Sequence, residues 1–135
     1  MKENELQHVE IDGKDYPFIY SLNVMASVQK KYGSMDKWSK IVEPKPIIKK
    51  NGEKFQPEPD LDALIFFFTE AFNEGIEIEN ENKGGNRPLL TQRQVGRLVT
   101  SLGLKEANQK LKEAVIGASP EKPTEEKNVN PTQNQ

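Results

Sequence analysis

The side chains that most often perform catalysis or bind metals are scarce in this sequence. It contains no cysteine and a single histidine, His8, which excludes disulfides, thiol catalysis and every cysteine-based metal site. His8 is expected on a strand beside charged residues, and the sequence places no serine or paired carboxylate to act with it. We therefore interpret His8 as a surface residue and predict that the chain is not an enzyme and has no catalytic residues.

Two other groups of residues have the types, but not the spacing, of a binding site. Glu77, Glu79 and Glu81 could collect a hard cation, yet they lack the Asp, Asn and Gly positions of a dedicated calcium loop. Gly84-Gly85 is followed by Asn-Arg-Pro, whereas a phosphate-binding loop continues with lysine and serine or threonine. The sequence therefore predicts no metal site and no cofactor.

Lysines are concentrated in one part of the chain. Eight of them lie at positions 30, 31, 37, 40, 45, 49, 50 and 54, against Asp36, Glu43 and Glu53. Such a stretch could follow a phosphate backbone, but it has no arginine, and its two aromatic residues, Tyr32 and Trp38, are not interleaved along its whole length as stacking on successive bases requires. We therefore favour a solvated surface that acidic stretches of a protein partner could contact. A nucleic-acid-binding regulator is the less favoured alternative.

An aromatic segment is the most informative feature. Ile65-Phe66-Phe67-Phe68 and Phe72 place apolar bulk around most of one expected helix. Phe66 and Phe67 lie more than about 100° from the centre of its main apolar stripe. Either this helix is central and buried on all sides, or Phe66 and Phe67 contribute to an exposed patch that binds a partner. The sequence leaves both interpretations open.

Size and composition fit one small domain without membrane contact. The chain has 135 residues, of which 34% are hydrophobic and 30% charged. Its longest run of large apolar residues, from Leu64 to Phe68, has five residues, whereas a bilayer-spanning helix needs roughly 20. No basic and apolar segment near Met1 resembles a secretory signal. We expect a cytoplasmic protein.

Two hairpins are expected. Around Asp12-Gly13, a favoured two-residue turn, the alternation of apolar residues pairs Val9 with Tyr16. The second, over 44–59, is bracketed by prolines, and its turn at Asn51-Gly52 would pair Ile48 with Phe55. A plain loop is the alternative for this second segment, which we expect to be a small arm.

Helix caps and helical spacing of apolar residues predict five helices. They extend between Ser21 and Gly33, over 35–42 after Ser34, over 61–74 between Asp60 and Gly75, from Thr91 to Gly103, and from Leu104 to Gly117. In the first helix Leu22, Met25, Val28 and Tyr32 form the apolar side, and a polar loop is expected over 76–90. The fold class is therefore α+β, a small mostly helical domain with an N-terminal β-hairpin.

The domain is expected to span 7–117. Residues 118–135 combine three prolines with polar residues and almost no apolar ones. Such a segment cannot bury enough surface to offset the entropy of ordering its backbone, so we predict a disordered polar tail.

Several short motifs, in their order along the chain, resemble those of a known family. They are the hairpin Ile11-Asp12-Gly13-Lys14-Asp15-Tyr16-Pro17, the helix end Lys31-Tyr32-Gly33-Ser34 with Trp38 beyond it, Phe72-Asn73-Glu74-Gly75, Arg87-Pro88-Leu89-Leu90-Thr91, and Val95-Gly96-Arg97-Leu98-Val99. Together they resemble the small tail assembly chaperones of long-tailed phages and prophages, especially those of Gram-positive hosts. The resemblance covers most of the chain from Val9 to about Leu104. The arm is longer than is usual in that family.

The resemblance implies a non-catalytic role in virion morphogenesis. Such chaperones associate with the tape measure protein, a long helical chain that fixes tail length, until tail tube subunits polymerise around it. They act in the cytoplasm of the bacterial host and are not expected in the mature virion. In many relatives a ribosomal frameshift produces a longer form whose added domain recruits tail tube subunits. The sequence leaves self-association open.

Trp38, Phe66 and Phe67 are the predicted partner-binding residues, because a chaperone of an amphipathic helix needs an apolar patch or groove. The alternatives to this function are another phage morphogenesis protein, such as a connector or tail-completion protein, and the nucleic-acid-binding regulator.

Overall fold

The computed structural model describes residues 6–118, with side chains described as far as 114. In chain order the elements are β1 (Gln7–Ile11), β2 (Lys14–Phe18), α1 (Leu22–Tyr32), α2 (Met35–Val42), β3 (Ile47–Ile48), β4 (Lys54–Phe55), α3 (Leu61–Lys83), α4 (Gln92–Leu102) and α5 (Leu104–Ala118). The predicted α+β fold, mostly helical with an N-terminal β-hairpin and a second small hairpin, is confirmed. The predicted disordered tail, 118–135, lies outside the described residues except for Ala118.

The first hairpin has the predicted register. Val9 pairs with Tyr16, and the positive φ angles of Asp12 and Gly13 match the turn that a two-residue hairpin loop requires. The ring of Phe18 contacts three rings of α3 at centroid distances between 5.2 and 6.3 Å. A two-stranded hairpin is marginal alone, so this contact with α3 stabilises it.

Helix α3 is longer than predicted. The expected end at Gly75 is wrong, because the helix continues to Lys83 and most of the predicted loop 76–90 is helical. Gly75 serves close packing instead: a Cβ atom there would lie 2.7 Å from the carbonyl carbon of Pro17 in β2. The helix ends at Gly84, whose φ of 70° is left-handed.

Two asparagines of α3 hold the chain that follows it. The Asn73 side chain donates to the Leu90 carbonyl oxygen and accepts from the Leu90 N–H, at 2.9 and 2.8 Å. Asn80, two turns further along the same face, makes the same pair of bonds with Arg87. The segment between α3 and α4 therefore returns along α3.

Helices α1 and α2 begin at the predicted caps. The Ser21 hydroxyl accepts from the Val24 N–H, and the Ser34 hydroxyl accepts from the Lys37 N–H. The predicted apolar side of α1 is partly wrong, because Leu22 is 79% exposed and the buried residues are Val24 and Val28.

Helix α4 begins with the predicted Thr91 capping box, and α5 packs on the body through two alanines and a leucine. Among the α5 side chains that the structure describes, up to residue 114, the buried ones are Ala107, Leu111 and Ala114.

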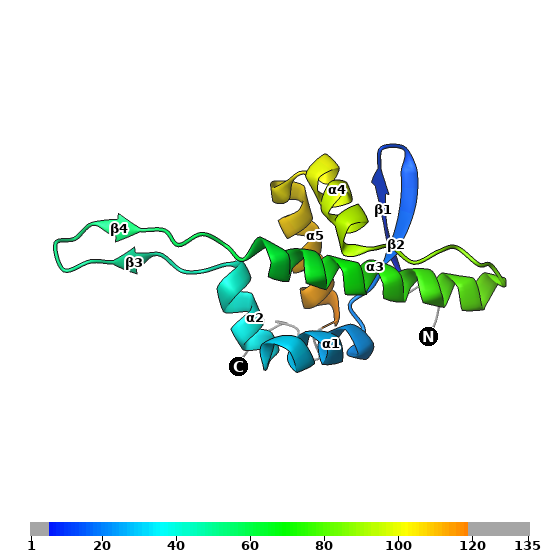
Figure 1. The fold of residues 1–135 in the computed structure, drawn as a ribbon, viewed down its shortest axis with the longest axis horizontal. Coiled ribbons are helices and arrows are strands. Elements are labelled where there is room, and N and C mark those ends of the chain that lie inside the picture. Colours follow the sequence, from blue (N-terminus) through cyan, green and yellow to red (C-terminus); the bar gives the residue numbers. More distant parts are fainter. Residues whose placement is uncertain (1–5, 119–135) are drawn as a thin grey trace, which may run out of the picture.

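Helix α3 lies at the centre of the body, with the hairpin, α1, α2 and the α4–α5 pair around it (Figure 1). The second hairpin projects away from this body (Figure 1). In the described part of the chain, no helix has both the length and the hydropathy required to cross a bilayer.

Candidate functional site

Two of the three predicted partner-binding residues belong to the core. Phe67 is 0% exposed, and its ring contacts those of Phe18, Tyr20, Trp38 and Phe68. The prediction that Phe67 contributes to an exposed patch is therefore wrong. The physical reason is that the hairpin and α2 cover the side of α3 that the main apolar stripe leaves open.

Trp38 is also buried, with 2% of its surface exposed. Its indole N–H donates to the Ala63 carbonyl oxygen at 3.0 Å, and its ring lies 5.0 Å from that of Phe67. Trp38 is thus no exposed anchor, which corrects the prediction. It does line a surface hollow, described below.

Phe66 differs from the other two because it is half-buried. Its ring packs edge-on against Tyr32 of α1 at 5.7 Å, and the Lys31 ammonium lies 4.6 Å from the ring centroid. The cation and the neighbouring ring cover part of the phenylalanine. Phe66 therefore lies on the α1 side of α3, and the structure does not join it to Trp38 and Phe67 in one surface.

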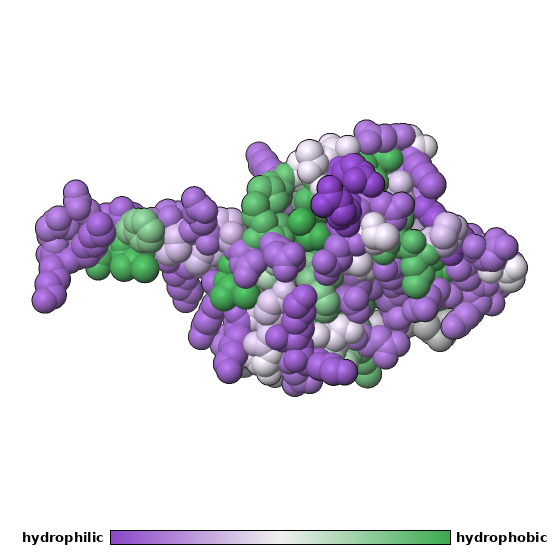
Figure 2. All heavy atoms as spheres, in the orientation of Figure 1, coloured by the Kyte–Doolittle hydropathy of each residue, from purple (hydrophilic) through white to green (hydrophobic). Residues whose placement is uncertain are grey.

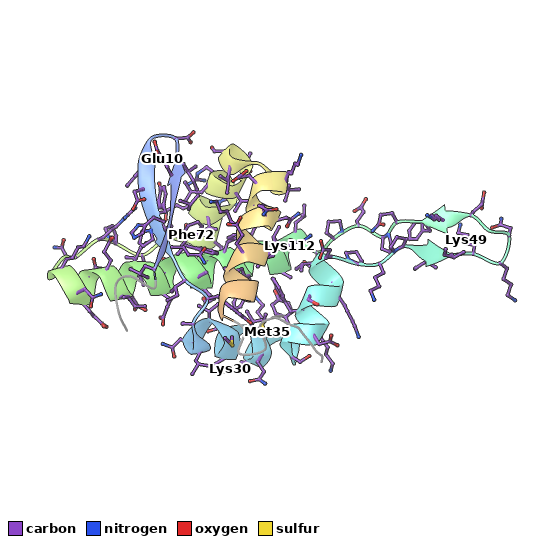
Figure 3. All side chains as sticks on the ribbon, turned by 180° about the vertical axis from the view of Figure 1, so that it is seen from behind. Glu10, Lys30, Met35, Lys49, Phe72 and Lys112 are labelled. Atoms are coloured by element: carbon purple, nitrogen blue, oxygen red, sulfur yellow. The ribbon has the colours of Figure 1, made fainter. Side chains whose placement is uncertain are left out.

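An apolar hollow lies between α2 and α5. Trp38 and Val42 line it from α2, and Leu111 lines it from α5. Its volume is about 170 Å³ and its wall is almost entirely apolar. Glu43 and Lys112 also line it and form an exposed ion pair with an N–O distance of 3.4 Å. Lys112 lies on the side of α5 that faces the root of the second hairpin (Figure 3). This α2–α5 hollow is one candidate binding site.

The second hairpin is the other candidate. We call residues 44–59 the arm. Ile47, Ile48 and Phe55 are 53%, 65% and 50% exposed, and apolar atoms gather midway along the arm whereas its tip is polar (Figure 2). Half or more of each apolar side chain therefore remains in contact with water.

The pairing in the arm differs from the prediction. Ile47, not Ile48, lies opposite Phe55. The Lys49 N–H donates to the Glu53 carbonyl oxygen at 2.8 Å, which leaves three residues in the loop. Gly52 takes the left-handed conformation, with φ 86°, that such a loop needs before its bulge. The predicted two-residue turn is therefore wrong by one residue.

The arm is fixed at its root and makes its other hydrogen bonds within itself. At the root, the Asp60 N–H donates to the Ile41 carbonyl oxygen at 2.8 Å. Just beyond, the Gln56 side chain donates to the Pro44 carbonyl oxygen at 3.0 Å. The first bond closes the body just outside the arm and the second lies within the arm. Among residues 6–118, no residue of the arm is hydrogen-bonded or ion-paired to the body. The arm is thus positioned but uncovered.

The arm also carries a local excess of positive charge. Lys45, Lys49, Lys50 and Lys54 are all exposed, and the arm contains two glutamates, Glu53 and Glu58. The four ammonium groups form no ion pair with any described residue, although Lys49 lies 5.9 Å from the Phe55 ring centroid. Apolar and cationic side chains therefore share this surface.

One grouping of potential metal ligands occurs elsewhere. Ligand atoms of His8, Asp15 and Glu79 lie within 4.8 Å of one another, and His8 Nδ1 is 2.7 Å from Asp15 Oδ2. Arg87 already occupies this neighbourhood: its guanidinium is 3.6 Å from Glu79 and donates to the Asp15 carbonyl oxygen at 2.8 Å. The positive charge of the Arg87 guanidinium would repel a metal ion bound beside it. Through its contacts with Glu79 and Asp15, Arg87 connects the hairpin to α3. Glu77 and Glu81, predicted in a loop beside Glu79, lie on α3.

Two tyrosines have shifted acidities. Burial raises the pKa of Tyr20. Burial, followed by the negative charges of Asp62 and Asp60, raises the pKa of Tyr32. Both phenols therefore stay protonated at neutral pH, and neither is activated as a base or nucleophile.

The sequence contained a signal for the arm but not for the hollow. Apolar residues between prolines occur at Ile47, Ile48 and Phe55, a pattern that could have pointed to the arm, whereas Leu111 had the spacing of an ordinary core residue. Comparisons with family models, with curated proteins and with solved structures found no match to this chain.

Proposed function

We propose that this chain is a non-catalytic tail assembly chaperone of a long-tailed phage or prophage, which binds the tape measure protein during tail morphogenesis. It acts in the cytoplasm of the bacterial host, remains absent from the mature virion, and leaves the partner when tail tube subunits polymerise.

One observation carries the proposal: within residues 6–118, two apolar surfaces remain open to solvent. The α2–α5 hollow is open, and Ile47, Ile48 and Phe55 of the arm are exposed. A long amphipathic helix is recognised by apolar grooves that receive its anchoring side chains. The motifs that resemble tail assembly chaperones supply the identity of that helix.

The test is co-expression with the tape measure protein of the same phage, followed by affinity purification and light scattering. The proposal predicts a soluble complex with several copies of this chain per partner. An insoluble partner, with this chain eluting alone, would contradict it.

The alternatives give different results. A connector or tail-completion protein would be present in purified particles, where a chaperone is absent. The four arm lysines are the observation that favours a nucleic-acid-binding regulator, which would retard duplex DNA in a gel with a steep dependence on salt.

A further inference from the structure

We propose that the α2–α5 hollow receives one bulky apolar side chain of an acidic amphipathic helix, and that the arm lies along this helix with its lysines facing the helix's carboxylates. The inference rests on the proposed function and specifies the chemistry of the segment that is bound.

The size of the hollow limits what it accepts. An apolar cavity of about 150 Å³ is large enough for a benzene ring, and pockets for drug-sized ligands begin near 300 Å³. The α2–α5 hollow, at about 170 Å³, therefore fits one phenylalanine, leucine or isoleucine side chain.

The hollow is preformed. Its Trp38 wall is fixed by the hydrogen bond to Ala63 and by the ring contact with Phe67. Leu111, on the opposite wall, is itself buried and fixed on α5. Because its walls are already ordered, the hollow loses little conformational entropy when a side chain binds in it.

The arm continues from the hollow without a break. Val42 and Glu43 line the hollow, and the arm begins at the next residue. Four residues lie between Val42 and Ile47, so their Cα atoms are no more than about 17 Å apart even if the chain is extended. A helix covers that distance in about 11 residues, or three turns. One helix of three to four turns can therefore fill the hollow and contact the Ile47–Phe55 pair.

Charge selects the partner. The arm carries four exposed lysines against two glutamates, and no described residue forms an ion pair with those lysines. An acidic helix is attracted to such a surface and a basic helix is repelled, with an effect that decreases as salt screens it.

Neither a lipid layer nor a nucleic acid fits both the arm and the hollow. Lys49, Lys50 and Asn51 form the end of the arm, and the apolar residues lie behind them, so insertion tip-first into a lipid layer would desolvate charges. A nucleic acid could contact the lysines but offers no aliphatic side chain for the hollow. A helical protein segment satisfies both sites.

Trp38 provides the measurement. It is the only tryptophan and lines the hollow, so its fluorescence reports occupancy. The probes are two synthetic helical peptides with identical leucine positions, one with glutamates and one with lysines on the polar face, and a glutamate peptide whose leucines are replaced by serine. Binding is measured separately by fluorescence anisotropy of labelled peptides.

We expect the acidic leucine peptide to change Trp38 emission and to bind about tenfold more tightly than its basic twin at low salt, with the difference narrowing at high salt. The serine peptide is expected to leave the emission unchanged. Equal binding of the acidic and basic peptides would overturn the inference, as would binding without a change in Trp38 emission. The inference would also be overturned if duplex DNA bound the arm more tightly than the acidic peptide and displaced it.

Variants separate the two parts of the site. Val42→Phe fills the hollow and should abolish the emission change. Lys49→Glu with Lys54→Glu should weaken acidic-peptide binding at least tenfold. Lys30→Glu with Lys105→Glu is the matched control, because it makes the same change in net charge at exposed positions outside the arm.

The outcome is distinguishable from a failure of the proposed function. If the Val42→Phe and the arm-charge variants still keep the tape measure protein soluble, the chaperone proposal holds and this inference is wrong. If the unmodified chain fails to keep it soluble although the acidic peptide binds as described, the proposed partner is wrong.

Discussion

The body around α3 and the arm use apolar residues in opposite ways. In the body, the rings of Phe67, Phe68 and Phe72 are each about 1% exposed or less and contact other rings. In the arm, Ile47, Ile48 and Phe55 are each at least half exposed. Burying an apolar side chain contributes roughly 1.5–3 kcal/mol, so the body obtains stability from its aromatics whereas the arm does not. Among the described residues, nothing buries the arm's apolar side chains, and our proposal assigns them to an interaction with another molecule.

The largest predicted effect tests the body. Phe67→Ala removes a fully buried ring that contacts four others, and should lower the free energy of unfolding by about 3–5 kcal/mol. Thermal and urea denaturation measure this loss. A change of less than about 1 kcal/mol would show that Phe67 is not part of the core.

Gly75→Ala tests the approach of α3 to β2. The new Cβ would meet the Pro17 backbone at 2.7 Å, and we expect a loss of about 1–3 kcal/mol. Gly96→Ala is the matched control within α4, since its Cβ would lie 3.6 Å from the Ile65 Cδ1 atom. Alanine is favoured over glycine inside a helix by about 1 kcal/mol, so this control should be neutral or stabilising. Equal losses in both variants would contradict the packing assigned to Gly75.

Phe66→Ser tests the half-buried ring, which is intermediate between the buried rings of the body and the exposed residues of the arm. Loss of the contacts with Tyr32 and Lys31 should cost about 1 kcal/mol, and the yield of the tape measure complex should be unchanged, because we assign binding to the hollow and the arm. Denaturation and affinity purification are the two measurements. A stable variant that no longer retains the partner would restore Phe66 as a binding residue.

The smallest effect on stability is expected in the arm. Ile47→Ser with Phe55→Ser should change the free energy of unfolding by no more than about 0.5 kcal/mol, because both side chains are already exposed. The same variant should retain much less tape measure protein in affinity purification. A drop in melting temperature like that of Phe67→Ala would place the arm's apolar residues in the fold instead.

Local chemistry made much of the fold predictable. Ser21, Ser34, Asp60 and Thr91 each cap a helix where the sequence placed the cap, because capping depends on neighbours within three residues. The register of the first hairpin followed from Asp12-Gly13 for the same reason.

The arm's turn was wrong by one residue for a local reason, because Asn51-Gly52 belongs to a three-residue loop. The larger errors depend on contacts distant in sequence. Gly75 is inside α3 because β2 lies against it, which the sequence around residue 75 does not record. Helical spacing separated Phe67 from the main stripe but could not say that the hairpin and α2 cover it. The hollow is lined by Val42 and Leu111, which are far apart in the sequence, so no local pattern could have predicted it.

Hydrogen–deuterium exchange of the chain with and without its tape measure partner tests the central claim most directly. The account predicts slower exchange over 38–60 and over 104–112, which contain the hollow and the arm, and little change over 61–83. Protection centred on α1 and the Phe66 side of α3, with the arm exchanging as fast as in the free chain, would contradict it.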